Sequence, residues 1–234
     1  MSGDRTGHDY WWDESSLIEQ AFDSAADKTA IYIKNLDVTA TLAEHIIDRI
    51  GDHRKKEDWI KFVVSECSDN KHLERVVNAA VSHFCCLELA DVQLNGTNLN
   101  RCISAHMPTP NINPVVSTKT LQRLELREIS LSFEQACVLG EGIAKTKSLR
   151  ELRLRSVSVD HHGFRKLALG LRSNQSIESL QLIRCQLDDR KVAMLAEALA
   201  KHSRLKELDP KGHKGQKGQH KTEFLKLMFG FLEF

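Results

Sequence analysis

The sequence LQRLELREISL occupies residues 121–131, and two similar stretches follow it, LRELRLRSVSV at 149–159 and IESLQLIRCQL at 177–187. The three copies begin 28 residues apart and carry apolar residues at positions 1, 4, 6, 9 and 11. Self-similarity at one fixed period indicates a solenoid, because a single unit cannot bury its apolar face without a stacked neighbour. Each copy is therefore predicted to be the beginning of one repeat and to form a strand.

A helix is predicted in the second half of each copy. Apolar or small residues recur there at the i, i+3, i+4 and i+7 spacing of one helix face, in the columns Ala136/Phe164/Val192, Leu139/Leu167/Leu195, Gly140/Ala168/Ala196 and Ile143/Leu171/Leu199. Ser132, Asp160 and Asp188 precede these columns in register, and their side-chain oxygens can accept the unpaired N–H groups of a first helical turn. Small side chains in the third column are expected to let each helix lie close over its own strand. A repeated strand-then-helix order predicts a parallel sheet with the helices outside.

These residues resemble the leucine-rich repeat of the ribonuclease-inhibitor-like type, which has a unit of similar length and often carries Cys or Asn at the position of Cys185. Three consecutive units match in both the strand and the helix columns. The resemblance implies an α/β leucine-rich repeat solenoid, with a parallel concave sheet and helices on the convex side. It also implies that the concave strands bind a partner, but no chemistry, because a fold does not determine a function.

Composition is typical of an ordinary globular protein. The chain has 234 residues, of which 41% are hydrophobic and 28% charged, and its net charge is +1. These values exclude the disordered, collagen-like and membrane classes and give no overall signal for nucleic-acid binding. We find no secretory signal pattern and no apolar run of about 18 residues, the length that suggests a membrane span. An intracellular protein is therefore expected, in the cytoplasm or alternatively in the nucleus.

Two residue types bear on that location. Cys67, Cys137 and Cys185 occupy apolar columns, so we expect them to be small buried side chains in a reducing compartment. Two sites, at Asn95 and Asn174, match the acceptor pattern for N-glycosylation. Without a secretory route, both are expected to be ordinary turn residues.

The sequence predicts five regions. They are a mobile acidic N-terminus (1–15), an N-terminal capping helix (16–27), a repeat array (28–209) with an irregular insertion around 95–120, a flexible Lys/Gly linker (210–221) and an apolar C-terminal segment (222–234). The capping helix is expected to begin at a capping box formed by Ser16 and Glu19 and to cover the first strand. An aromatic and acidic docking peptide is the alternative interpretation of this N-terminal region.

The first units of the array are degenerate. Their apolar strand columns are Ile31, Ile33, Leu36 and Val38, then Trp59, Phe62, Val64 and Cys67, then Leu87, Leu89, Val92 and Leu94. A helix is expected after each of these strands, and the helix after the first strand is expected to be capped near Thr41.

The later boundaries of the array leave alternatives open. Three of the four prolines fall in the insertion, which is either a functional loop or a tolerated surface insertion. At the other end Asp209 and Pro210 interrupt the pattern, so Leu205 and Leu208 open at best an edge strand. The apolar segment 222–234 folds back over the open end, docks on a partner or reflects a truncated or misread gene end.

No catalytic, metal-binding or cofactor-binding constellation is predicted. The closest clusters, His83 with Cys85 and Cys86 and the pair His161-His162, lack the paired spacing of a zinc site and the pattern of a catalytic triad. We also find neither a phosphate-binding loop nor a dinucleotide fingerprint.

The side chains that alternate with the core leucines face away from the core. On this face the candidate partner-binding residues are Arg123, Glu125, Arg127, Glu151, Arg153, Arg155, Gln181 and Ile183. Strands in register about 4.8 Å apart place Arg123 beside Glu151 and Glu125 beside Arg153, which favours that register. Arg127 then stands beside Arg155, and two adjacent like charges cost stability unless an anion binds them. We therefore predict a binding surface near the carboxyl ends of these strands.

The sequence favours a non-enzymatic protein–protein interaction module that binds an unidentified protein on the concave face. A regulator of a small GTPase, which accelerates hydrolysis, is one alternative, because other leucine-rich repeat proteins of this type have that role. We find no residue in this chain that matches one responsible for that role in those proteins. A fragment of a longer structural repeat array is the other alternative.

Overall fold

The computed structural model describes residues 14–24, 30–52, 61–67, 71–92, 121–200 and 202–209. Its strands are β1 (Ala30–Lys34), β2 (Lys61–Ser65), β3 (Cys86–Ala90), β4 (Arg123–Arg127), β5 (Ser130–Leu131), β6 (Glu151–Arg155), β7 (Ser158–Val159), β8 (Ser179–Ile183) and β9 (Glu207–Asp209). Its helices are α1 (Glu14–Ser24), α2 (Ala40–Asp52), α3 (Lys71–His83), α5 (Phe133–Lys145), α6 (His161–Ser173) and α7 (Asp189–Leu199).

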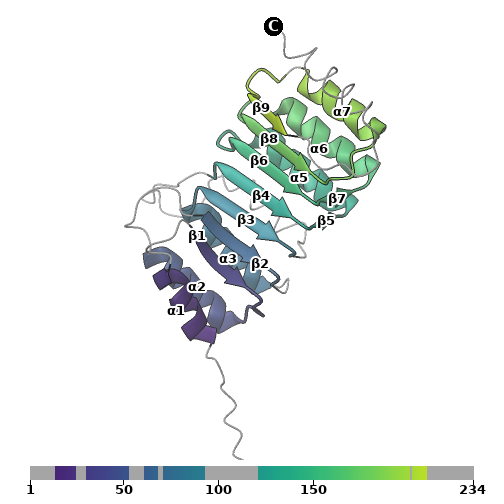
Figure 1. The fold of residues 1–234 in the computed structure, drawn as a ribbon. Coiled ribbons are helices and arrows are strands. Elements are labelled where there is room, and N and C mark those ends of the chain that lie inside the picture. Colours follow the sequence, from purple (N-terminus) through teal and green to yellow (C-terminus); the bar gives the residue numbers. More distant parts are fainter. Residues whose placement is uncertain are drawn as a thin grey trace, which may run out of the picture.

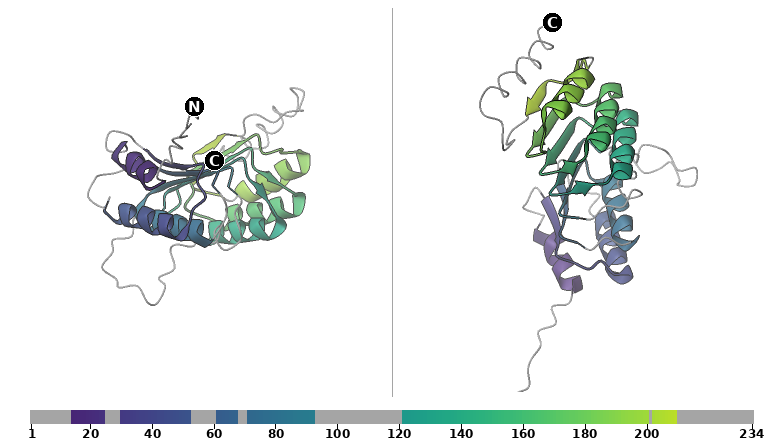
Figure 2. Two further views of the ribbon diagram at one scale, coloured as in Figure 1. Left: turned by 90° about the horizontal axis from the view of Figure 1, so that it is seen from below. Right: turned by 90° about the vertical axis from the view of Figure 1, so that its right-hand side faces the viewer.

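The strands form a seven-stranded parallel sheet in the order β1-β2-β3-β4-β6-β8-β9, which follows the chain. The short strands β5 and β7 pair separately. Helices α2, α3, α5, α6 and α7 form a layer on one face of the sheet, while α1 lies at the end of the sheet next to β1 (Figures 1 and 2). This repeating strand–helix arrangement confirms the predicted α/β fold with a parallel sheet.

One core lies between the sheet and the helix layer. The strand columns of the three similar copies are buried throughout, and the helix columns are buried except Val192, which is only partly buried. Helix α1 adds Ile18 and Phe22 to the core. The predicted apolar columns are therefore confirmed, because residues 28 apart occupy equivalent places in successive units.

The three predicted helix caps are present. Ser132, Asp160 and Asp188 accept the backbone N–H groups of Gln135 (3.2 Å), Gly163 (2.6 Å) and Lys191 (2.9 Å). At Ser132 the Gln135 side chain also accepts the backbone N–H of the cap, which completes a capping box.

The caps of the two earlier helices differ from the prediction. Helix α2 contains Thr41, and its first turn is capped two residues earlier, where Thr39 Oγ1 accepts the N–H of Leu42 at 3.3 Å. Helix α1 already includes Glu14, so Ser16 lies within its first turn rather than at a cap. Serine and threonine are common at several positions of a first turn, and the sequence pattern alone did not separate them.

Strand ends share a left-handed corner that no sequence pattern indicated. Asn35, Glu66, Asp91, Glu128, Ser156 and Arg184 directly follow six strands and have φ between 48° and 57°. The N–H groups of the first five donate to the last carbonyl of the next strand. Positive φ favours Gly, Asn and Asp, and only two of these six residues are of those types.

Gly140 packs against a neighbouring helix, which corrects the expectation that its small size serves the contact with its own strand. A methyl group at Gly140 would overlap the carbonyl oxygen of Lys166 in α6, and one at Gly170 would overlap the carbonyl oxygen of Gly140. Helices α5 and α6 therefore meet backbone to backbone.

Replacing Gly170 by alanine is expected to lower the free energy of unfolding by about 1–3 kcal/mol, because overpacking outweighs the better helix propensity of alanine. Gly51 provides the matched control, since a methyl group on this glycine of α2 would meet nothing within 4 Å. Gly51→Ala should raise the free energy by up to about 1 kcal/mol. Urea melts measure both, and two changes of the same sign would contradict the close packing.

The sheet ends as predicted, at an edge strand. Within the described residues β9 pairs only with β8, with Leu208 opposite Leu180. None of the described helices is long and apolar enough to cross a membrane. Several predictions fall outside the described residues, namely the N-terminus up to residue 13, Trp59, Leu94, Asn95, the insertion around 95–120, the linker 210–221 and the segment 222–234.

Candidate partner-binding surface

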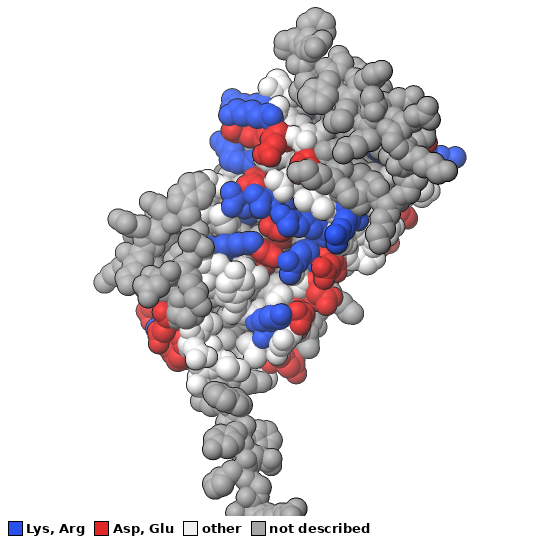
Figure 3. Space-filling view, viewed as in Figure 1, with Lys and Arg blue, Asp and Glu red and all other residues white. Residues whose placement is uncertain are grey.

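The face of the sheet opposite the helix layer, here called the open face, carries all eight predicted binding residues. Three come from β4, three from β6 and two from β8. Register places Arg123, Glu125 and Arg127 opposite Glu151, Arg153 and Arg155, and it places Arg153 and Arg155 opposite Gln181 and Ile183. Figure 3 shows the charged side chains gathered over the middle of this face.

The two predicted cross-strand pairs are present. The Nε atom of Arg123 forms a close ion pair with Glu151, and Arg153 Nη1 lies 3.8 Å from Glu125 Oε2. Arg153 also contacts Glu151 on its own strand. These contacts tie β4 to β6, and their guanidinium groups are therefore largely occupied within the molecule.

Arg127 and Arg155 stand side by side as predicted, but the expectation that they lack a carboxylate is wrong. Each contacts a glutamate diagonally across the sheet. The Nε atom of Arg155 lies 3.1 Å from Glu125 Oε1, and the Nε atom of Arg127 lies 3.9 Å from Glu88 Oε1. Their mutual repulsion is therefore offset inside the molecule.

Glu88 is one of two charged residues of this surface, with Lys61, that the sequence prediction missed. It lies on β3 directly opposite Glu125, and Lys61 on β2 forms ion pairs with both. A signal was available, because Leu-Glu-Leu recurs at residues 87–89 and 124–126. The offset of 37 positions from Glu88 to Glu125 hid this signal from the comparison at a period of 28 residues.

The carboxylates of this surface lie beneath the guanidinium groups. Glu88 and Glu125 are only 6% and 4% exposed, whereas the side chains of Arg127 and Arg155 are 45% and 37% exposed. A buried carboxylate is tolerated only where cations pair with it. Glu125 was predicted to contact a partner, and the structure places it among the buried residues of this surface.

We call the set Lys61, Glu88, Arg123, Glu125, Arg127, Glu151, Arg153 and Arg155 the charged cluster. Its five cationic and three anionic side chains leave a net charge of +2. An acidic row, Glu66, Asp91 and Glu128, stands at the carboxyl ends of β2, β3 and β4, and its members are exposed. Acidic side chains border the basic ones there in Figure 3.

The thiols behave mostly as expected. Cys67 and Cys185 are buried, and each donates to backbone carbonyls of its own and the preceding strand. Burial raises the pKa of Cys185 to about 11 and also raises the pKa of Cys67. Cys137 is only partly buried, which corrects its prediction. None of the five described cysteines is in a disulfide.

Two other clusters have structural contacts of their own. His161 Nε2 lies 2.5 Å from Asp188, which caps α7, and the sulfur atoms of Cys85 and Cys86 are 3.7 Å apart. A hydrogen bond with Cys85, together with burial, raises the pKa of Cys86. Within the described residues, no group of three or more His, Cys, Asp or Glu side chains could hold a metal ion.

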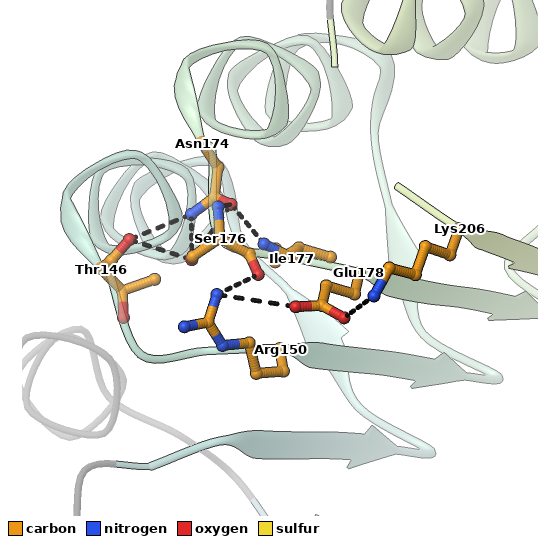
Figure 4. Close-up of polar contacts among 7 residues, drawn as sticks. All are labelled: Thr146, Arg150, Asn174, Ser176, Ile177, Glu178 and Lys206. Carbon is orange, nitrogen blue, oxygen red and sulfur yellow. Dashed lines mark hydrogen bonds and ion pairs between the residues drawn. The ribbon is translucent and has the colours of Figure 1, made fainter. Parts of the chain in front are cut away.

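Asn174 is a buried turn residue, as predicted for this match to the glycosylation pattern. It is 1% exposed, and its side-chain nitrogen donates to the carbonyls of Ile143 (2.7 Å) and Thr146 (3.2 Å). Its side-chain oxygen accepts the N–H groups of Ser176 (2.7 Å) and Ile177 (2.8 Å). Figure 4 shows the bonds of Asn174 to Thr146, Ser176 and Ile177, between the end of α6 and the preceding turn. The side-chain nitrogen, to which a sugar would be attached, is buried and already donates two hydrogen bonds, so Asn174 cannot be a glycosylation site in the folded protein.

Comparison with known proteins does not extend this description. The chain matches no protein-family model, and it matches no curated protein.

Proposed function

We propose that this chain is a non-enzymatic protein–protein interaction module, built as a leucine-rich repeat solenoid of the ribonuclease-inhibitor-like type. The proposal draws on the three copies that match in strand, cap and helix columns, and on a sheet whose strand order follows the chain. In such an array the open face is the concave side, and the partner binds there. The early units diverge from the pattern, but their strands pair in the same register.

One observation carries the functional part of the proposal. The open face presents partly exposed guanidinium groups that form ion pairs with buried carboxylates, whereas the other face of the same sheet is covered by helices. Ion-paired charges on a face that none of the described helices covers favour recognition of a partner, because the side chains need less further ordering when they bind. Arg127, Arg155 and the partly exposed Ile183 form the centre of this surface.

The test is a comparison of capture from cell extract by three full-length tagged proteins. They are the wild type, Arg127→Gln with Arg155→Gln, and the control Arg165→Gln with Arg190→Gln. Arg165 and Arg190 are exposed arginines on α6 and α7, so the control removes the same charge from the helix layer. The proposal expects the first variant to lose proteins that the wild type and the control both retain.

Other results would redirect the assignment. Equal capture by all three proteins would remove the open face as the binding site. Recovery of a small GTPase whose hydrolysis the chain accelerates would favour the regulatory alternative.

Once a partner is isolated, Arg127→Gln with Arg155→Gln is expected to weaken its binding by about 2 kcal/mol or more, about a 30-fold higher Kd. Stability should fall by no more than about 1 kcal/mol, because both ion pairs are partly exposed to solvent. Calorimetric titration measures the Kd and urea melts measure the stability. A large loss of stability with unchanged Kd would show that the arginines serve the fold alone.

A further inference from the structure

Arg127 and Arg155, the two central arginines of the open face, make similar contacts with the carboxylates of neighbouring strands. Arg127 and Arg155 are register partners on adjacent strands, so their backbones are about 4.8 Å apart. The nearest carboxylate contact of each is through Nε, to Glu88 and to Glu125. Neither makes a hydrogen bond through its two Nη groups to any other residue that the structure describes. Each therefore keeps a two-pronged donor edge for an oxyanion.

We propose that these two edges bind the phosphoryl group of a phosphorylated serine or threonine in a partner protein. This inference rests on the proposed function, since it names the chemical class that the interaction surface recognises. A phosphomonoester carries a charge of about −1.5 to −2 at neutral pH and three acceptor oxygens. It can accept from two guanidinium edges together, and it matches the net charge of +2 on the charged cluster. A single carboxylate, with one charge and two oxygens, occupies only one such edge.

The acidic row selects among phosphorylated ligands. Glu66, Asp91 and Glu128 follow β2, β3 and β4 at the strand ends where Arg127 and Arg155 also lie, and Glu66 is paired with Lys34. The carboxylates of this row would repel the neighbouring charges of an extended polyanion. Nucleic acid and anionic membranes present such repeated charges, whereas a phosphorylated peptide presents one compact dianion. Lys or Arg beside the phosphorylated residue would meet the acidic row. Ile183, next to Arg155 in register, offers an apolar contact on the other side.

The charged cluster also explains why the arginines are ready to bind. Glu88 and Glu125 are themselves paired with Lys61 and Arg153. Arg155 Nε lies 3.1 Å from Glu125 in an ion pair without hydrogen-bond geometry, and Arg127 Nε lies 3.9 Å from Glu88, so each arginine has a carboxylate at its inner edge. Glu88 and Glu125 are thus positioning residues that never touch the ligand. An arginine whose Nε side already faces a carboxylate loses less side-chain freedom when it captures a phosphoryl group.

Fluorescence anisotropy with the full chain tests the proposal. The probes are labelled degenerate peptides with a fixed phosphoserine or phosphothreonine flanked by Lys or Arg, and matched peptides with Ser, Thr or Glu at that position. We expect the phosphorylated peptides to bind at least about tenfold more tightly than either match. Arg127→Gln with Arg155→Gln should abolish this preference, and Arg127→Lys with Arg155→Lys should weaken it by retaining charge without the planar fork. The Arg165→Gln with Arg190→Gln control should bind like the wild type.

Three outcomes would overturn the proposal. They are equal affinity for phosphorylated and unmodified peptides, an unchanged preference in the Arg127 and Arg155 variants, and tighter binding to phosphatidylserine vesicles than to any peptide. Treating the cell extract with phosphatase separates this proposal from the proposed function. If capture still depends on Arg127 and Arg155 but not on phosphatase, the phosphoryl inference fails and the interaction surface stands. If capture depends on neither, both fail.

Discussion

Replacing Leu180 by alanine is expected to lower the free energy of unfolding by about 2–5 kcal/mol. Leu180 is fully buried at the centre of β8, between Leu152 on β6 and Leu208 on β9 in the register of the sheet. Alanine would leave a cavity that the surrounding strands and helices cannot fill without moving. Because β8 pairs with β6 and β9, the loss should also loosen these two neighbouring strands.

Urea melts of the two proteins measure this loss. Gln181→Ala is the matched control, because the next residue of β8 lies on the open face and is only partly buried. The control should change the free energy by less than about 0.5 kcal/mol. A loss below about 1 kcal/mol for Leu180→Ala would show that the leucine column is not essential to the core.

The leucine columns were predictable because they depend on two strict periodicities. A strand alternates its faces every second residue, and the copies repeat after 28 residues, so Leu124, Leu152 and Leu180 had to share one side of adjacent strands. The same register predicted the neighbours of Arg123, Glu125 and Arg127. The cap positions of Ser132, Asp160 and Asp188 were also predictable, because the apolar helix columns show where the first turn of each helix begins.

The arrangement of charges on the open face needed the structure. Register gives the directly opposite residue, but long side chains also reach diagonal neighbours on the next strand. Arg155 reaches Glu125 and Arg127 reaches Glu88 in this way. Which diagonal a side chain takes depends on its rotamer and on the competing contacts of Lys61 and Arg153, and none of these is encoded in a residue pattern.

Helix contacts escaped prediction for a related reason. The spacing i, i+3, i+4 and i+7 shows which face of a helix is apolar, but not what covers each position along it. Gly140 sits in an apolar column of α5 and yet meets α6 through its backbone. The left-handed corners after the strands were also hidden, since Glu128 and Arg184 are not residues that favour positive φ.

Asn174→Asp is expected to lower the free energy of unfolding by about 3 kcal/mol or more at pH 7, because a buried carbonyl that loses its donor costs about 1–3 kcal/mol. The side-chain nitrogen of Asn174 donates to Ile143 and Thr146, both in the preceding unit. Figure 4 shows the bond to Thr146. A carboxylate of the same shape would place oxygen and negative charge against those two carbonyl oxygens. It would keep the bonds from Ser176 and Ile177, so the variant isolates the lost donors and the added charge.

The loss should depend on pH in a predictable direction. Burial and the two facing carbonyls disfavour the charged carboxylate, so its pKa in the folded state lies above the unfolded value of about 3.9. The folded state then binds more protons than the unfolded state, and stability falls as pH rises from the unfolded pKa to the folded one. Below pH 4 the protonated carboxyl can again donate one hydrogen bond. The deficit relative to the wild type should therefore shrink on acidification.

Gln175→Glu is the matched control for this prediction, since it makes the same chemical change in the adjacent, exposed residue. It should change the free energy of unfolding by less than about 0.5 kcal/mol at any pH. Urea melts of the wild type and both variants at pH 4, 5.5 and 7 measure the comparison. If Asn174→Asp matched the control at pH 7, Asn174 would not be holding successive units together, and the buried network would have no part in the stability of the array.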